Sequence, residues 1–87
     1  SFYEKLSSIK ELYTLPSSAN YFMCRLNKGK AFDLATFLLD KNNILIKVLT
    51  GKRGIDGEWI RIAVRTDEEN NLLVEAINKY YKQDTVY

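Results

Sequence analysis

The amino-acid sequence predicts an α+β domain in which helices cover one side of a small, mostly antiparallel sheet. Two kinds of pattern lead to this fold class. Some segments carry apolar residues at helical spacing, and others alternate apolar with polar side chains, as strands do. In chain order they predict helix, strand, helix, strand, strand and helix. The 87 residues contain no internal repeat and no linker rich in Pro, Gly or Ser, so we expect residues 1–87 to form a single domain.

In the first half of the chain, helical patterns flank extended segments. Residues 2–10 carry apolar side chains at helical spacing, and residues 12–15 form a short extended candidate that ends at Pro16, which lacks an amide donor. Alternation over 20–26 predicts a strand, and the following helix should end near 41–43, where asparagine tolerates the left-handed conformation. The expected inward side chains are Phe22, Cys24 and Leu26 on the strand, and Phe32, Leu34, Ala35, Leu38 and Leu39 on the helix.

The second half predicts two strands and a helix with a well-marked start. Residues 44–49 are apolar, β-branched and few, which favours a buried strand, and alternation resumes over 59–65 after a glycine-bearing loop. Thr66 begins a capping box, in which its hydroxyl accepts from the Glu69 amide while the Glu69 side chain reaches back. The expected buried stripe of the last helix is Leu72, Leu73, Ala76, Ile77 and Tyr80.

Composition excludes several classes of chemistry. The chain has no His, and therefore lacks the usual near-neutral general base and the commonest metal ligand. The single Cys24 can form neither an internal disulfide nor a cysteine-rich zinc site, so we expect no metal and a cytoplasmic location. No apolar run approaches the roughly 20 residues that span a bilayer, so we expect no membrane partner. The net charge of +2 comes from dispersed basic residues, which argues against nucleic acid.

Three polar residues in or beside the predicted strands are candidates for binding. Arg61 stands between two isoleucines, and a guanidinium is well shaped to bind a carboxylate or phosphate through two hydrogen bonds. Lys47 follows an apolar run, and Asn20 opens a strand with an amide. Each has a simpler explanation, which is a solvated face for Arg61, a side chain that reaches solvent at a strand end for Lys47, and a turn or cap for Asn20.

The order of six segments resembles the C-terminal small domain of fold-type-I, pyridoxal-phosphate-dependent aminotransferases. The likeness is greatest to the group of histidinol-phosphate aminotransferases and threonine-phosphate decarboxylases, and it extends over nearly the whole chain. The segments are PSSANYF (16–22), NILIK (43–47), GID (54–56), WIRIAVRT (59–66), EEN (68–70) and LL (72–73).

This resemblance implies roles for the three candidate residues. The arginine at the position of Arg61 binds the substrate carboxylate, and the asparagine at the position of Asn20 faces the active site. The position of Lys47 is usually an arginine that contacts the substrate phosphate. Lysine keeps the positive charge there but loses the bidentate fork, so this departure bears on phosphate recognition.

The resemblance also implies a larger parent enzyme, either an aminotransferase or a related decarboxylase of an amino acid or its phosphorylated relative. Pyridoxal phosphate would be bound by the large domain of that parent, because the motifs for holding the cofactor do not occur in these residues. We therefore expect no catalytic residue here, an inactive and monomeric fragment, and a homodimeric parent. Two alternatives remain: a free-standing α+β interaction or anion-binding module, and a nucleic-acid-binding domain suggested by the mild basic excess.

Overall fold

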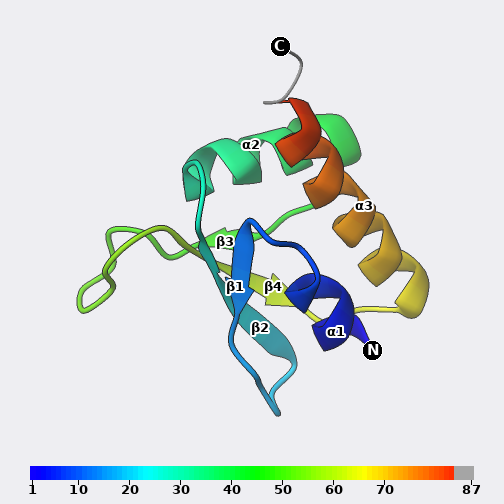
Figure 1. Ribbon diagram of the computed structural model, residues 1–87, viewed down its shortest axis with the longest axis horizontal. Helices are drawn as coiled ribbons and strands as arrows, with labels where there is room; N and C mark the ends of the chain where they lie inside the picture. Colours follow the sequence, from blue (N-terminus) through cyan, green and yellow to red (C-terminus); the bar gives the residue numbers. More distant parts are fainter. Residues whose placement is uncertain (84–87) are drawn as a thin grey trace.

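The computed structural model describes residues 1–83 and arranges them as helices packed on one antiparallel sheet (Figure 1). This architecture confirms the predicted α+β class. The extended segment that precedes Pro16 is itself a strand, so two strands, and not one, separate the first two helices. The elements are α1 Phe2–Ser7, β1 Leu12–Thr14, β2 Tyr21–Leu26, α2 Ala31–Asn42, β3 Lys47–Val48, β4 Trp59–Ala63 and α3 Asp67–Gln83.

The sheet has the strand order β1-β2-β4-β3, and every neighbouring pair is antiparallel. The pairing places Tyr13 opposite Arg25, and it places Arg61 opposite both Met23 on β2 and Lys47 on β3. β2 and β4 are the central strands. Because side chains alternate across a strand, this register decides which residues share a face.

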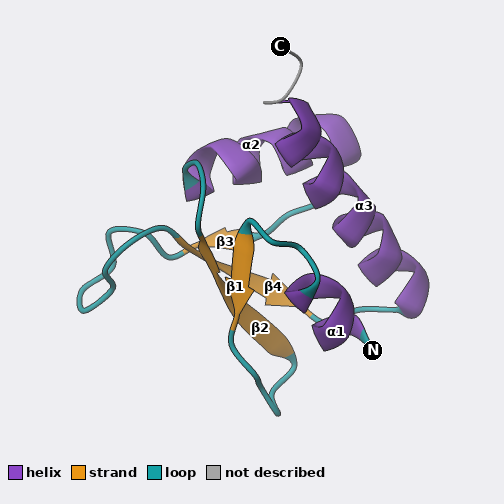
Figure 2. Cartoon of the chain, viewed as in Figure 1, coloured by secondary structure: helices purple, strands orange, loops and turns teal. Residues whose placement is uncertain are grey.

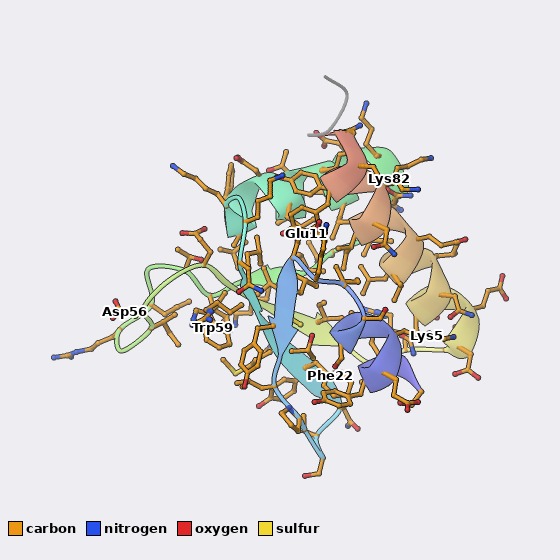
Figure 3. The ribbon with its side chains drawn as sticks, in the orientation of Figure 1. Lys5, Glu11, Phe22, Asp56, Trp59 and Lys82 are labelled. Carbon is orange, nitrogen blue, oxygen red and sulfur yellow. The ribbon has the colours of Figure 1, made fainter. Side chains whose placement is uncertain are left out.

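One face of the sheet is buried beneath the helices and carries the hydrophobic core (Figure 2). Leu34 and Leu38 of α2 and Ile77 of α3 pack onto it and are almost inaccessible to solvent. The expected inward residues of the 20–26 strand are confirmed as buried, and Figure 3 shows Phe22 beside α1. The side chains that the strands bury on this face are Leu12, Thr14, Phe22, Cys24, Leu26, Ile60 and Ile62.

The opposite side of the sheet is not covered by any helix of residues 1–83. We call it the open face. Its side chains are exposed or half-buried, as the alternation of burial along each strand shows. The open face consists of Tyr13, Tyr21, Met23, Arg25, Lys47, Trp59, Arg61 and Ala63.

The prediction of a buried strand over 44–49 is wrong for most of its length. Only Lys47 and Val48 are in β3, and Leu45 is 76% exposed. The reason lies at the end of α2, where Asn43 adopts the predicted left-handed conformation with φ 54° and the Ile44 amide donates to the Leu38 carbonyl at 3.0 Å. These bonds cap the helix, so strand pairing does not begin until Lys47.

The predicted helix faces are correct in part. Leu34 and Leu38 are buried, whereas Phe32 is 70% exposed and Leu39 is 47% exposed. On α3 the prediction is correct in the middle of the stripe and wrong at its two ends. Leu72 is 52% exposed, and the buried tyrosine is Tyr81 and not Tyr80. The Tyr81 hydroxyl donates to the Lys28 carbonyl at 3.1 Å, which satisfies its polar group. Neighbours in a helix lie about 100° apart, so a small rotation of the helix exchanges them.

The predicted capping box at the start of α3 is formed in part, because the Glu69 side chain reaches back to the hydroxyl of Thr66 and not to its amide. The Glu69 amide donates to the Thr66 hydroxyl at 3.2 Å, and that hydroxyl donates to the Glu69 carboxylate at 2.9 Å. Three acidic residues occupy the first turn, where the positive end of the helix dipole stabilises them. No helix within residues 1–83 combines the length and apolar character needed to cross a bilayer.

Candidate functional site

The open face gathers positive charge without acidic residues. Arg25, Lys47 and Arg61 lie on it, and none of its eight residues is Asp or Glu. The nearest acidic residue along β4, Glu58, accepts a hydrogen bond from the Ala31 amide at 2.7 Å and so faces α2. Within residues 1–83 the only ion pair joins the Ser1 amine to Glu4. None of these three cations is therefore neutralised by an ion pair within the described residues.

Arg61 and Lys47 are direct neighbours across the β3–β4 pair. Opposite residues in antiparallel strands have Cα atoms about 4.5–5.5 Å apart, so the two cationic side chains project side by side from the same face of the sheet. Both side chains are exposed. The sequence places each of them on a strand, but the register brings them together.

The Arg61 guanidinium stacks on an aromatic ring of the neighbouring strand. Its Cζ atom lies 5.1 Å from the centroid of the Tyr21 ring, within the range of a cation–π interaction. A second pair of the same kind occurs on the β1 side, where the Arg25 Cζ atom is 5.7 Å from the Tyr13 ring. Sequence reasoning identified Arg61 but not the role of Tyr21, because this contact depends on the β2–β4 register.

Asn20 lies just before β2, at the end of the sheet where Tyr21 pairs with Ala63. Its carbonyl accepts from the Val64 amide at 2.8 Å, which ties this position to the strand that carries Arg61. The side chain of Asn20 is exposed. The structure thus places Arg61 and Lys47 as neighbours and Asn20 at the adjoining end of β2.

The loop between β3 and β4 projects beyond the sheet (Figure 3). Asp56 lies three residues before Trp59, the first residue of β4. The Trp59 indole nitrogen donates to the Asp56 carbonyl at 2.7 Å, which holds this part of the loop against the start of the strand. Gly57 has a φ of 89°, which residues with a side chain rarely adopt, so a substitution there would strain the backbone. The loop therefore delimits the open face beside Trp59.

The side chains of residues 1–83 are better suited to binding an anion than to transferring a proton. No cluster of three or more His, Cys, Asp or Glu side chains suited to a metal ion occurs within residues 1–83. Cys24 is fully buried, and desolvation raises the pKa of its thiol despite a contact with Thr14, so it is not an activated nucleophile. The arrangement of the open face is suited to holding an anion.

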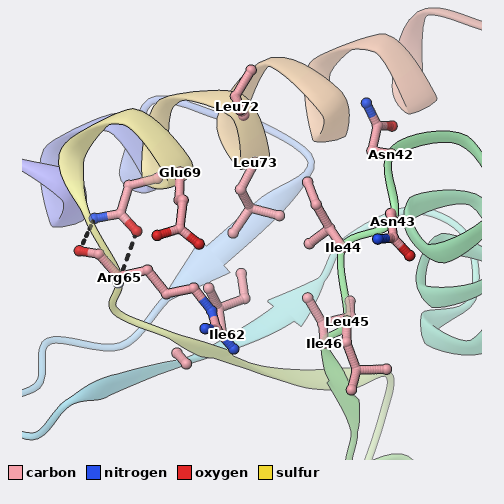
Figure 4. A pocket seen from close by; sticks show the side chains of 12 residues that line it. Asn42, Asn43, Ile44, Leu45, Ile46, Ile62, Arg65, Glu69, Leu72 and Leu73 are labelled. Carbon is pink, nitrogen blue, oxygen red and sulfur yellow. Dashed lines mark hydrogen bonds between the residues drawn. The ribbon is translucent and has the colours of Figure 1, made fainter.

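A cavity of about 400 Å³ lies on the helix side, between the end of α2 and the start of α3 (Figure 4). Ile46, Ile62 and Leu73 form part of its apolar lining, and Arg65 and Glu69 lie among its polar residues. None of the three candidate residues lines this cavity. Its lining shares Ala63 with the open face, but the candidate cations lie outside it.

Comparison with known proteins reveals relatives of the kind that the sequence resemblance implied. No protein-family model matches the chain. It is 40% identical over 82 residues to an L-serine phosphate decarboxylase of Sulfurospirillum multivorans and 37% identical over 83 residues to one of Campylobacter jejuni. It is also 30% identical over 77 residues to a histidinol-phosphate aminotransferase of Methanococcus aeolicus. These matches include 93%, 94% and 88% of this chain, respectively, but only 21% of each relative.

Solved structures agree in fold and extent. A decarboxylase from Sulfurospirillum multivorans superposes with a TM-score of 0.86 at 40% identity, over 91% of this chain and 23% of that one. An L-threonine-O-3-phosphate decarboxylase from Porphyromonas gingivalis superposes with a TM-score of 0.87 at 28% identity, over 93% of this chain and 25% of that one. The chain spans about a fifth of the length of its curated relatives. Its relatives are therefore serine- and threonine-phosphate decarboxylases and histidinol-phosphate aminotransferases, and the chain corresponds to a small domain of such a protein.

Proposed function

We propose that this chain is the substrate-clamping domain of a pyridoxal-phosphate-dependent enzyme that acts on an O-phosphorylated amino acid. Arg61 binds the substrate carboxylate, Lys47 binds the phosphate, and Asn20 contributes an amide at the same site. The observation that carries the proposal is the pairing of Arg61 with Lys47 on a sheet face that has no acidic residue. Two adjacent cations suit a small molecule with two anionic groups.

The names of the relatives support this substrate class. L-serine phosphate, L-threonine-O-3-phosphate and histidinol phosphate are all phosphorylated compounds, and the first two also carry a carboxylate. The two relatives at 37% and 40% identity are decarboxylases, which favours decarboxylation over transamination in the parent of this chain. Lysine binds phosphate as a point charge, so Lys47 can serve this end of the substrate without the planar fork that arginine provides.

The cofactor belongs to the remainder of the parent protein. A lysine that holds a cofactor covalently is typically desolvated or otherwise activated, and every lysine within residues 1–83 is exposed. Pyridoxal phosphate, when bound, withdraws electrons from the substrate α-carbon. Arg61 acts by fixing the direction of the carboxylate, which determines the bond of the α-carbon that is presented for cleavage. A homodimeric parent and a cytoplasmic location remain predictions.

The test compares single variants of the full-length parent. Arg61→Ala should lower kcat/KM for L-serine phosphate about 30-fold to several thousandfold. This corresponds to about 2–5 kcal/mol of lost transition-state stabilisation for a desolvated pair of guanidinium and substrate carboxylate. O-phosphoethanolamine, the same molecule without its carboxylate, should inhibit this variant as well as it inhibits the wild type. Lys47→Ala should weaken the binding of both compounds, because both carry the phosphate.

Arg25→Ala is the matched control, since Arg25 lies on the same face but stacks on Tyr13 instead. It should leave the kinetics near those of the wild type. Unchanged kinetics in Arg61→Ala would remove the proposed role of Arg61, and an equal loss of affinity for O-phosphoethanolamine would show that Arg61 does not read the carboxylate.

A second candidate function is a free-standing module that binds an anion or a partner without catalysis. The observation that favours it is that no helix of residues 1–83 covers the open face, which leaves that face accessible to a partner. Such a module would bind L-serine phosphate when produced alone, whereas a clamping domain needs the remainder of the parent. Isothermal titration of the chain with L-serine phosphate, beside the full-length parent, separates the two functions.

A further inference from the structure

We propose that Tyr21 is a positioning residue for Arg61. Its ring holds the guanidinium on the open face in the orientation that receives the substrate carboxylate. This inference rests on the proposed function of Arg61, but it concerns a residue with a role that neither the resemblance nor the comparisons assign. It begins from the distance of 5.1 Å between the Arg61 Cζ atom and the centroid of the Tyr21 ring.

The register explains how the two side chains meet. Tyr21 pairs with Ala63, and Arg61 lies two residues earlier on β4, so Tyr21 and Arg61 are diagonal neighbours on one face. Diagonal neighbours are about 7–8 Å apart, a distance that a long side chain crosses. Ala63 carries only a methyl group, which leaves space beside the ring. Tyr21 is 39% exposed, so most of its side chain is covered.

Electrostatics gives the guanidinium a reason to lie over Tyr21. Directly opposite Arg61 stand Lys47 on one side and Met23 on the other. Lys47 has the same charge and repels the guanidinium, and Met23 offers no hydrogen-bonding oxygen. With no carboxylate on the open face, the electron-rich face of the Tyr21 ring is the favourable neighbour.

The consequence is a separation of the two cations. Tyr21 directly follows Asn20, so stacking on its ring draws the guanidinium toward the Asn20 end of β2 and away from Lys47. The carboxylate is then received near Arg61 and Asn20, and the phosphate near Lys47. A free arginine side chain would lose conformational entropy on binding, and the stacked one has lost part of it already.

The test uses the full-length parent with Tyr21→Leu and Tyr21→Phe. Removing a partly exposed cation–π contact should raise KM for L-serine phosphate about two- to fivefold in Tyr21→Leu, with kcat and thermal stability close to those of the wild type. Tyr21→Phe keeps an aromatic ring and should restore KM. Tyr13→Leu is the matched control, because it removes the equivalent ring beneath Arg25 and should change nothing.

Arg61→Ala separates failure of this inference from failure of the proposed function. If Arg61→Ala raises KM and Tyr21→Leu does not, Tyr21 has no positioning role, although Arg61 still binds substrate. If Arg61→Ala itself has no effect, the proposed function fails and this inference fails with it. Tyr21→Leu added to Arg61→Ala should cause no further rise in KM. An additional rise in the double variant, or a failure of Tyr21→Phe to restore KM, would overturn the inference.

Discussion

Asn70 connects the strand that carries Arg61 to the last helix, and its removal gives a quantitative test of the fold. The side chain is 5% exposed, and it bridges the backbone of a single residue. Its Oδ1 atom accepts from the Arg65 amide at 3.0 Å, and its Nδ2 atom donates to the Arg65 carbonyl at 3.1 Å. Asn70→Ala removes both bonds and frees the chain between β4 and α3.

The expected loss follows from these two bonds. A hydrogen bond contributes about 0.5–1.5 kcal/mol net, so two amount to about 1–3 kcal/mol. Alanine also raises helix propensity by up to about 0.7 kcal/mol, which partly conceals the loss. Asn78→Ala, at an exposed position on the same helix, gains the same propensity, and the Asn78 side chain makes no hydrogen bond within residues 1–83. The difference between the two variants therefore isolates the bridge.

Urea unfolding of the 87-residue chain, followed by far-UV circular dichroism, measures this difference. With a slope of about 1 kcal/mol/M, the midpoint of Asn70→Ala should lie about 1–3 M below that of Asn78→Ala. Equal midpoints for the two variants would refute the reasoning, because they would mean that water replaces the bridge at no cost.

Two further predictions concern burial. Burial raises the pKa of the Cys24 thiol, so a thiol reagent at pH 8 should label the folded chain far more slowly than the urea-unfolded chain; stability should fall as pH rises above about 8.5, where the unfolded thiol ionises first. Fast labelling of the folded chain would contradict this. Leu34→Ala should cost about 2–5 kcal/mol of unfolding free energy because Leu34 is fully buried, whereas Leu45→Ala should change it by less than about 0.5 kcal/mol because Leu45 is 76% exposed. A comparable loss in both would place Leu45 in the core.

Local patterns were sufficient wherever a few neighbouring residues decide the structure. The hydrogen bonds between Thr66 and Glu69 join residues three apart, and the left-handed Asn43 ends its helix through bonds to the last turns. The alternation that buries Phe22 and exposes Arg25 likewise needs only the period of a strand. The fold class followed from such elements.

Patterns failed where burial depends on how elements pack. Residues 44–49 have the composition of a buried strand. Ile44, however, forms part of the cap of α2, and Leu45 is exposed. Leu72 and Tyr81 are both large and apolar in part, and only the packed orientation of α3 buries the second and not the first. Helical periodicity does not fix that orientation to within one residue.

The candidate site divides in the same way. The sequence alone was enough to single out Arg61, Lys47 and Asn20, because each is a polar residue in or beside an apolar strand. Arg61 and Asn20 also match a family motif, and Lys47 stands at a motif position that is usually arginine. The pairing of Arg61 with Lys47 and the ring of Tyr21 beneath the guanidinium come from hydrogen-bonded register between distant segments. A shift of two residues would keep each side chain on its own face but give Arg61 different neighbours, and nothing local in the chain excludes that shift. Tertiary structure therefore decided which charges meet, since only the packed sheet fixes the register.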